Sequence, residues 1–199
     1  MTSTVTVMRH CESELSERGV VNGDPSVPCG LSAAGRTQAH ALAAALAGDP
    51  VDLAVTSRFR RTIETAELAL TGRDVTRMTM PELDDLHFGE FEGRSLAEYR
   101  TWAHRQPVSA RPGGDGESRV DGVRRYCRAL RQVLALPDHD HVLVVAHGLP
   151  LAYVVRAAAR EELSDQVDPL EKGAPHRFAS GDLHTALGRL ESWTRACVA

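Results

Sequence analysis

The stretch HVLVVAHG, residues 141–148, is the part of the sequence that best defines the fold. Val142 to Ala146 form an unbroken apolar run, which is typical of a strand inside a parallel sheet that helices cover on both faces. The run ends abruptly at His147, and Gly148 opens a segment predicted to be helical to about Arg160. A buried strand that leads directly into a helix predicts an α/β protein.

Two other stretches repeat this arrangement. TVTVMRH, residues 4–10, is an apolar run that ends in Arg9 and His10, and VDLAVTS, residues 51–57, ends in Ser57. A single polar strand end is readily explained as a solvated end. Three parallel strands that end in polar side chains at the same edge of a sheet instead indicate a ligand-binding crevice there.

The remaining elements follow from the spacing of apolar residues and from turn signals. Helices are predicted at 31–48, 58–70, 95–106 and 118–136, a third strand at 75–80, and a last strand near 184–190. Ser32 suits the N-cap of the first of these helices, and Gly48 suits its end. Strands that alternate with helices predict a three-layer αβα sandwich around a mostly parallel central sheet.

Length and composition bound the function. A chain of 199 residues with 42% hydrophobic and 25% charged residues fits one domain, 1–199, with a small cap predicted at about 87–120. A net charge of -4 gives no support for a nucleic-acid partner. We expect no membrane partner either, because no stretch is long and apolar enough to cross a bilayer and no signal pattern opens the chain. Both points favour the cytoplasm.

The cysteines lack the spacing of a metal site. In a reducing compartment they are expected to be free thiols, with a pair across the loop between Cys11 and Cys29 as the alternative. His139 and His141 form an HxH pattern that suits a metal, but PDHDHVL is better explained as a solvated turn before a strand. We therefore predict no metal and no cofactor.

The side chains at the strand ends suit one kind of ligand. Arg9, His10, His147 and either Arg58 or Arg61 would form a cationic pocket, and the helix start at Gly148 would add backbone N–H groups and a positive dipole end. Arginine binds phosphate oxygens in pairs, and a neutral imidazole is a competent nucleophile. A phosphoryl group is the natural occupant, and the acidic loop LDDLHFGEFEG, residues 83–93, offers a proton donor.

At this point the chain resembles the histidine phosphatase superfamily, also called the phosphoglycerate mutase-like family. Six stretches are similar to the family's motifs in the right order: RHCES, GLSAAGRTQA, SRFRRTIETA, LDDLHFGEFEG, RPGGDGES and VLVVAHG. The resemblance implies that His10 accepts the phosphoryl group. It also implies that Arg9, Arg61 (rather than Arg58) and His147 bind the phosphate, and that Asp85 is the acid.

The chain departs from the family's pattern at several positions. Cys11 stands where the family has glycine, Asp85 is shorter than the usual glutamate, and Ser16 replaces an asparagine that contacts phosphate. Cys29-Gly30 replaces a proline before the helix. Four residues are further candidates for the substrate pocket: Glu12, Ser13, Ser16 and His87.

The predicted function is therefore a metal-independent phosphatase that hydrolyses a small phosphomonoester through a phosphohistidine. One alternative is a phosphomutase of the phosphoglycerate mutase type, although residues 94–117 are short for the insertion with which such mutases exclude water. Another is a phospho-ligand binding protein without turnover. The expected partner is a small phosphorylated substrate, and the sequence leaves the oligomeric state open, a homodimer included.

Overall fold

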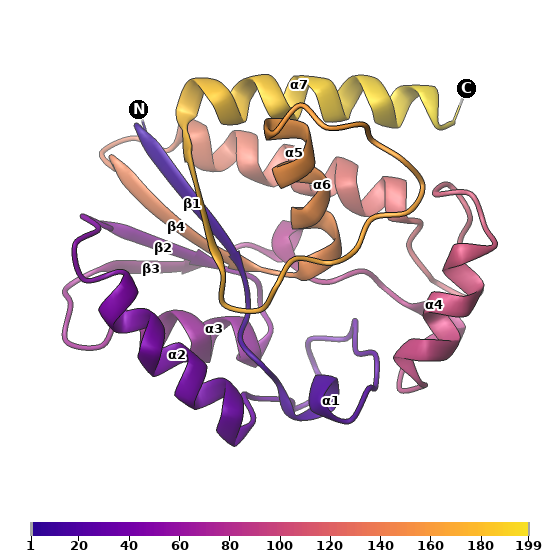
Figure 1. Ribbon diagram of the computed structural model, residues 1–199, viewed down its shortest axis with the longest axis horizontal. Coiled ribbons are helices and arrows are strands. Elements are labelled where there is room, and N and C mark those ends of the chain that lie inside the picture. The colour runs from indigo at the N-terminus through magenta and orange to yellow at the C-terminus, as the bar shows by residue number, and fades with distance from the viewer. Residues whose placement is uncertain (1, 199) are drawn as a thin grey trace.

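The centre of the computed structural model, which describes residues 2–198, is a five-stranded sheet in the order β3-β2-β4-β1-β5 (Figure 1). The strands are β1 (Thr4–Arg9), β2 (Leu53–Thr56), β3 (Thr76–Thr79), β4 (His141–Ala146) and β5 (Pro175–Ala179). β1, β2, β3 and β4 run parallel to one another, and β5 lies antiparallel along β1. The prediction of a mostly parallel sheet is confirmed.

The middle strands are the ones with unbroken apolar runs. β4 lies between β1 and β2, and Val5 and Val7 of β1 pair with Val142 and Val144. All four valines are fully buried, as expected of strands with both faces covered. The last pair in this register, Arg9 with Ala146, brings the ends of β1 and β4 to the same edge of the sheet.

Helices cover both faces of the sheet (Figure 1). On one face α2 (Ala33–Ala45) and α3 (Arg60–Ala69) pack on a cluster that includes Met8 and Val145. On the other face α5 (Arg119–Ala135), α6 (Gly148–Ala158) and α7 (Ser180–Ala196) pack on a cluster that includes Val7 and Val144. The fold is therefore the predicted αβα sandwich. None of the helices in residues 2–198 is long and apolar enough to span a membrane.

Short elements lie at the carboxyl end of the sheet. They are α1 (Glu14–Glu17), the 3-10 turns η1 (Pro81–Leu83) and η2 (Gly89–Phe91), and α4 (Leu96–His104). A third apolar cluster, which includes Val21, Phe88 and Tyr99, packs the loop after β1 against the acidic loop and α4. The predicted loop 11–30 thus contains one turn of helix, α1, which Ser13 caps.

The prediction of a last strand near 184–190 is wrong. These residues lie within α7, and the fifth strand is β5, which ends at Ala179, five residues before them. Leu183, Ala186, Leu187 and Leu190 are buried at spacings of three and four, which is a helical period. β5 carries no apolar run to reveal it, because an edge strand needs only every second side chain covered.

The helix predicted at 31–48 has its expected N-cap, since the Ser32 side chain accepts a hydrogen bond from the N–H of Gly35 at 3.2 Å. It ends at Ala45, before Gly48. The four cysteines are free thiols, so Cys11 and Cys29 do not pair.

Candidate active site

A cavity of about 510 Å³ opens where the parallel strands end. His10 follows β1 directly, Ser57 follows β2, and His147 follows β4 and precedes α6. The parallel pairing of these strands brings the three polar ends together, as the sequence predicts. Arg9, His10 and Gly148 line the cavity, whereas Ser57 lies behind His147.

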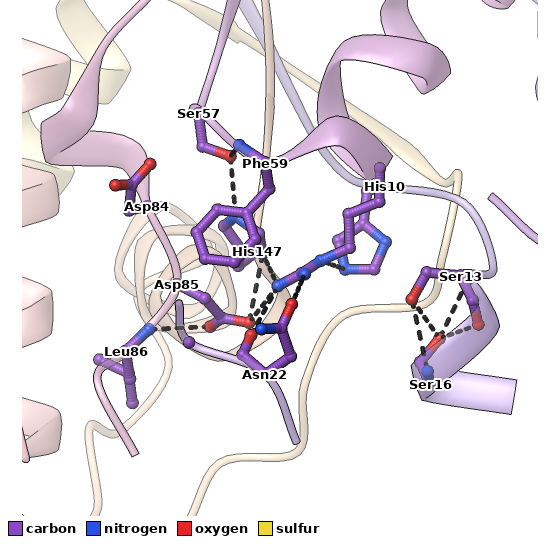
Figure 2. Close-up of polar contacts among 12 residues, drawn as sticks. His10, Ser13, Ser16, Asn22, Ser57, Phe59, Asp84, Asp85, Leu86 and His147 are labelled. Atoms are coloured by element: carbon purple, nitrogen blue, oxygen red, sulfur yellow. Dashed lines mark hydrogen bonds and ion pairs between the residues drawn. The ribbon is translucent and has the colours of Figure 1, made fainter. Parts of the chain in front are cut away.

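Arg61, in the first turn of α3, links the polar side chains of the cavity. Its Nε donates to Nε2 of His10 at 3.2 Å, and Nη1 donates to Oδ1 of Asn22 at 2.8 Å. Nη2 lies 3.1 Å from Oδ2 of Asp85 and 3.2 Å from Nδ1 of His147. Figure 2 shows His10, Asn22, Asp85 and His147 turned toward one another at this point. A single buried guanidinium therefore holds all four.

The hydrogen bonds of His10 define which ring nitrogen is free. Nδ1 lies 2.6 Å from the carbonyl oxygen of Cys11, and only an Nδ1–H can donate to a carbonyl. Nε2 then carries the lone pair and accepts the bond from Arg61. Burial, together with the charges of Arg61 and His147, holds the pKa of His10 well below its usual value of 6.5. The ring is neutral at pH 7 and nucleophilic at Nε2.

Cys11 contributes to the site through its backbone hydrogen bonds, and its side chain is buried. Its carbonyl orients His10, and its N–H donates to Oγ1 of Thr65 at 3.1 Å. Burial raises the pKa of the Cys11 thiol to about 11, so the thiol stays protonated. The replacement of the family's glycine by cysteine thus leaves the geometry of His10 intact.

His147 is fully buried between two polar partners. Nε2 lies 2.9 Å from the hydroxyl of Ser57, and Nδ1 lies 3.2 Å from Oδ2 of Asp85. The Ser57 hydroxyl in turn contacts that of Thr62 at 2.8 Å. Burial lowers the pKa of His147 despite the nearby carboxylate of Asp85. A neutral His147 donates from Nδ1–H to Asp85 and accepts the Ser57 hydroxyl at Nε2, so the 3.2 Å approach of Arg61 Nη2 to Nδ1 is a contact and not a hydrogen bond.

The two adjacent aspartates of the acidic loop have different surroundings. Asp85 lines the cavity, and its Oδ1 accepts the N–H of Leu86 at 3.0 Å. Asp84 is buried away from the cavity and binds the N–H and Nε of Arg58 at 2.9 and 2.8 Å. Arg58 is thus engaged outside the cavity, which leaves Arg61 as the arginine of α3 at the site.

Burial opposes ionisation of Asp85, but the hydrogen bond from His147 and the charge and hydrogen bond of Arg61 outweigh it and hold its pKa well below the usual range. Asp85 is therefore a carboxylate in the free protein.

One residue of α5 holds the acidic loop in place. Arg125 donates to the carbonyl oxygens of Glu82, Asp84 and Asp85 at 2.8 to 3.1 Å, and Glu117 binds the other side of the same guanidinium. Arg125 thereby fixes the backbone of the acidic loop at Asp85, the residue of that loop that lines the cavity.

Arg9 reaches the cavity because Gly148 has no side chain. A Cβ on Gly148 would lie 2.8 Å from both Cδ and Nε of Arg9. Nη1 of Arg9 donates to the carbonyl of Leu170 at 2.9 Å, and its buried Nε has no protein partner. Burial lowers the pKa of the Arg9 guanidinium, which remains charged at neutral pH. An anion in the cavity would complete its hydrogen bonding.

The other candidate pocket residues separate into two groups. Ser13 and Ser16 line the cavity, but their hydroxyls bond to each other at 3.0 Å as the cap of α1. Glu12 lies outside the lining and pairs with Lys172 and the Ser16 hydroxyl. His87 is exposed and does not line the cavity.

Sequence reasoning missed two buried polar residues of the cavity. Asn22, in VVNG, is buried and holds Arg61 through both its side-chain and its backbone oxygen. The only sequence feature that could have identified Asn22 is its place between two valines and a glycine. An asparagine in that position is explained equally well as a turn residue. Arg119, the first residue of α5, has no sequence signal that separates it from the other arginines of that helix, yet it is 5% exposed and lines the cavity.

The described residues, 2–198, hold no group of three or more histidine, cysteine, aspartate or glutamate side chains placed to bind a metal ion. Nδ1 of His139 instead lies 3.6 Å from a carboxylate oxygen of Asp52.

Comparison with known proteins identifies relatives of this chain. A family model described as the histidine phosphatase superfamily (branch 1) matches residues 5–169. The "Probable phosphoglycerate mutase GpmB" of Proteus mirabilis is 31% identical over 154 residues, which is 74% of this chain and 70% of the relative. The adenosylcobalamin/alpha-ribazole phosphatase of Salmonella typhimurium is 30% identical over 157 residues, 75% of this chain and 76% of the relative.

Solved structures share the fold. Bacillus stearothermophilus YhfR superimposes with a TM-score of 0.75 at 23% identity, over 87% of this chain and 89% of that one. A mycobacterial glucosyl-3-phosphoglycerate phosphatase superimposes with a TM-score of 0.72 at 24% identity, over 88% and 89% of the two chains.

Proposed function

Because the chain belongs to branch 1 of the histidine phosphatase superfamily, we propose that it hydrolyses a small phosphomonoester through a phosphohistidine on His10. The observation that carries this proposal is the tautomer of His10. The contact of Nδ1 with the carbonyl of Cys11 requires an Nδ1–H, so Nε2 keeps the lone pair. In the free protein this lone pair accepts the Nε–H of Arg61, and a bound phosphoryl group that takes over Arg61 releases it for attack.

In the first step Nε2 of His10 attacks phosphorus, and the bond from phosphorus to the leaving oxygen breaks. Negative charge on the phosphoryl oxygens is stabilised by Arg9, Arg61, His147 and the N–H of Gly148 at the start of α6. The unpartnered Nε of Arg9 supports this role, because a phosphoryl oxygen is the acceptor that it lacks. The positive charge comes from the protein's own side chains, so we assign no metal or cofactor.

Asp85 is the proposed proton donor to the leaving oxygen. In the free protein it is a carboxylate held by Arg61 and His147. A bound phosphoryl group competes for the same two donors and adds negative charge nearby, and both effects raise the pKa of Asp85. Asp85 then takes up a proton with the substrate and gives it to the leaving group. In the second step the carboxylate accepts a proton from the water that attacks the phosphohistidine.

The segment 87–120 is the proposed cap over the site. Phe88, Leu96, Tyr99 and Arg119 from this segment line the cavity, and Arg100 and His104 are exposed at its rim. A cavity with exposed rim residues admits water, which favours hydrolysis over transfer of the phosphoryl group back to the product. We place the protein in the cytoplasm, where free thiols stay reduced.

The mutase named among the relatives supports the second candidate function, isomerisation of a phosphoglycerate. The substrate panel that separates the two therefore contains phosphoglycerates, an alpha-ribazole phosphate, sugar phosphates and nucleotides. Released phosphate and bisphosphoglycerate-dependent isomerisation are measured on the same samples. Isomerisation faster than phosphate release would assign the mutase activity instead.

The decisive variant is His10→Ala. It should lose phosphate release by at least about a thousandfold and should lose the acid-labile label that a radioactive phosphomonoester leaves on the wild-type protein, since a nucleophile is removed. His40→Ala removes an exposed histidine of α2 and serves as the control. Turnover by His10→Ala within about tenfold of wild type would rule out His10 as the nucleophile.

A further inference from the structure

The cavity contains a second buried cation that the chemistry of the phosphoryl group does not use. Arg119 is 5% exposed and lines the cavity. Its Nη1 donates to the carbonyl of Asp165 and its Nη2 to the carbonyl of Gln106, both at 2.6 Å. No hydrogen bond joins Arg119 to His10, Arg61 or Asp85. It therefore lies on the wall that α4 and segment 159–174 form, apart from the polar cluster around Arg61.

The hydrogen bonding of Arg119 is incomplete. Three buried side-chain polar atoms in residues 2–198 have no partner, and two of them are the Nε atoms of Arg9 and Arg119. Both arginines line the same cavity. A phosphoryl group bound at His10 accounts for Nε of Arg9, and it leaves Nε of Arg119 without an acceptor. A buried N–H with no acceptor is costly, so a second polar group of the ligand is the missing partner.

The charge of Arg119 is also uncompensated. Within residues 2–198, no carboxylate oxygen lies within 4.0 Å of its guanidinium. The nearest acid of the same helix turn, Asp121, pairs with Arg111 and Arg124 instead. Arg119 is moreover the first residue of the 17-residue helix α5, where the helix dipole disfavours a cation. Three unfavourable features at one cavity residue indicate that an anion belongs there.

Apolar side chains line the same cavity as this cation and the phosphoryl site. Leu96 and Tyr99 of α4, Leu149 of α6 and Val167 of segment 159–174 line the cavity as well. A ligand that reaches both arginine sites must therefore pass an apolar wall, which suits a carbon chain or ring.

We propose that Arg119 is a specificity-determining residue that binds a second anionic group, a carboxylate or a phosphate, on the leaving portion of the substrate. The inference rests on the proposed function, because it assigns the first anion to His10 and Arg61. It narrows the substrate to a phosphomonoester with two anionic ends joined by an apolar or ring-like middle.

Binding of non-hydrolysable phosphonates tests this subsite without requiring turnover. The probes are carboxyethyl-, carboxypropyl- and carboxybutylphosphonate, each compared with the alkylphosphonate that lacks the carboxylate. A parallel series of alkylene bisphosphonates distinguishes a second phosphate from a carboxylate. In wild type, at the chain length that spans the two sites, the second anion should tighten binding about 10- to 100-fold, as expected for a charged hydrogen bond.

Arg119→Met should remove that gain and leave binding of the plain alkylphosphonates within about threefold of wild type. Arg119→Lys keeps the charge but lacks the Nε donor, and it should keep part of the gain. Arg105→Met, which removes an exposed arginine of the same region outside the cavity lining, is the matched control and should keep all of it.

Two results would overturn the proposal. One is the absence, in wild type, of any chain length at which a second anion tightens binding. The other is that both Arg119 variants lose the same factor in affinity for the plain alkylphosphonates and for the two-anion ligands. Arg119 would then have only a structural role, as the donor that joins the carbonyls of Gln106 and Asp165. Hydrolysis of p-nitrophenyl phosphate by wild type reports separately on the proposed function, because this compound has no second anion.

Discussion

In the proposed mechanism Asp85 serves in two protonation states, and its surroundings in the free protein favour only one of them. Arg61 and His147 hold it as a carboxylate, which suits the base that activates water. The acid form depends on the substrate's own charge. A donor of this kind matters most when the leaving oxygen is a poor leaving group, because a stable anion leaves without a proton.

We predict that Asp85→Asn cuts hydrolysis of an alkyl phosphate by about 10²–10⁴-fold, the usual contribution of a general acid. Formation of the phosphohistidine from p-nitrophenyl phosphate should suffer much less, since nitrophenolate is a stable anion. Because the base is lost too, a burst of nitrophenol should precede a slow phase. Stopped-flow absorbance measures both phases.

Asp84→Asn is the neighbouring control. Asp84 binds Arg58 outside the cavity, so this change should cost about 1 kcal/mol of stability for a half-exposed pair and leave the ratio of the two substrates unchanged. Equal losses on both substrates in Asp85→Asn, without a burst, would make Asp85 a structural residue. A selective loss in Asp84→Asn would move the acid to that position.

The apolar pattern predicts the residues that follow strands, and the family resemblance adds Arg61 and Asp85, but neither finds Asn22 or Arg119. His10 and His147 come directly after apolar runs, and parallel pairing then necessarily brings them to one edge. Asn22 and Arg119 reach the cavity only because the loop after β1 and the first turn of α5 fold over it. The local sequence around Asn22 and Arg119 does not predict this packing, because it depends on contacts between segments that are distant in the chain.

At the level of elements, α2 is positioned by a close approach to the chain beside His10. The N–H of Ser32 donates to the carbonyl of Glu12 at 3.0 Å, and a Cβ added at Gly35 would lie 1.9 Å from that same oxygen. The absence of a side chain at Gly35 therefore sets the distance between α2 and the residues that follow β1.

Gly35→Ala should consequently destabilise the protein by about 1–3 kcal/mol, because a backbone atom must move to admit the methyl group. Gly188→Ala is the matched control, since it also lies within a helix, α7, and a Cβ there meets nothing within 4 Å. It should stabilise the protein by about 0.5–1 kcal/mol through helix propensity. Urea denaturation of both variants measures the difference, and equal effects would contradict the docking of α2.

The two elements that the sequence confused, β5 and α7, show where element prediction fails. Both belong to the periphery of the fold, where β5 is half exposed and α7 covers the sheet with one face only. The inner strands β1 and β4 are recognisable because burial on both faces favours closely spaced apolar residues, unbroken from Val142 to Ala146 in β4 and interrupted only by Thr6 between Val5 and Met8 in β1.

For the whole molecule, we predict that a chelator leaves phosphate release unchanged. The proposed stabilising groups are the charged side chains of Arg9 and Arg61 and the neutral imidazole of His147, so removal of divalent cations removes no part of the machinery. Phosphate release is measured before and after dialysis against EDTA. Loss of activity that a divalent cation restores would contradict the mechanism and would direct attention to His139 and His141.

Acid should destabilise the molecule before its carboxylates titrate. Burial lowers the pKa of His10 and His147 in the folded protein, so the unfolded chain binds protons there at a higher pH. The free energy of unfolding should therefore fall between about pH 7 and pH 5, by at most about 1.4 kcal/mol per pH unit for each histidine. Protonation of Asp85, whose folded pKa is also lowered, adds a further loss below about pH 4.

Urea denaturation at a series of pH values measures this slope. His10→Asn removes one of the two buried imidazoles and should reduce the slope of the free energy of unfolding against pH. His40→Asn, at an exposed site, should leave that slope unchanged. A free energy of unfolding that stays constant from about pH 7 to pH 5 would show that the two rings are already charged in the folded state.

The cavity walls are supplied by connecting segments, while the reacting groups stand mostly at the ends of strands and at helix starts. The two sets of residues are therefore open to separate mutation. Random libraries confined to residues 11–30, 87–120 and 159–174, with Cys11, Asn22 and Glu117 kept because they position His10, Arg61 and Arg125, would sample new substrate preferences against an unaltered reaction. Directed evolution of this protein should accordingly yield variants with exchanged selectivity far more often than variants with a new kind of chemistry.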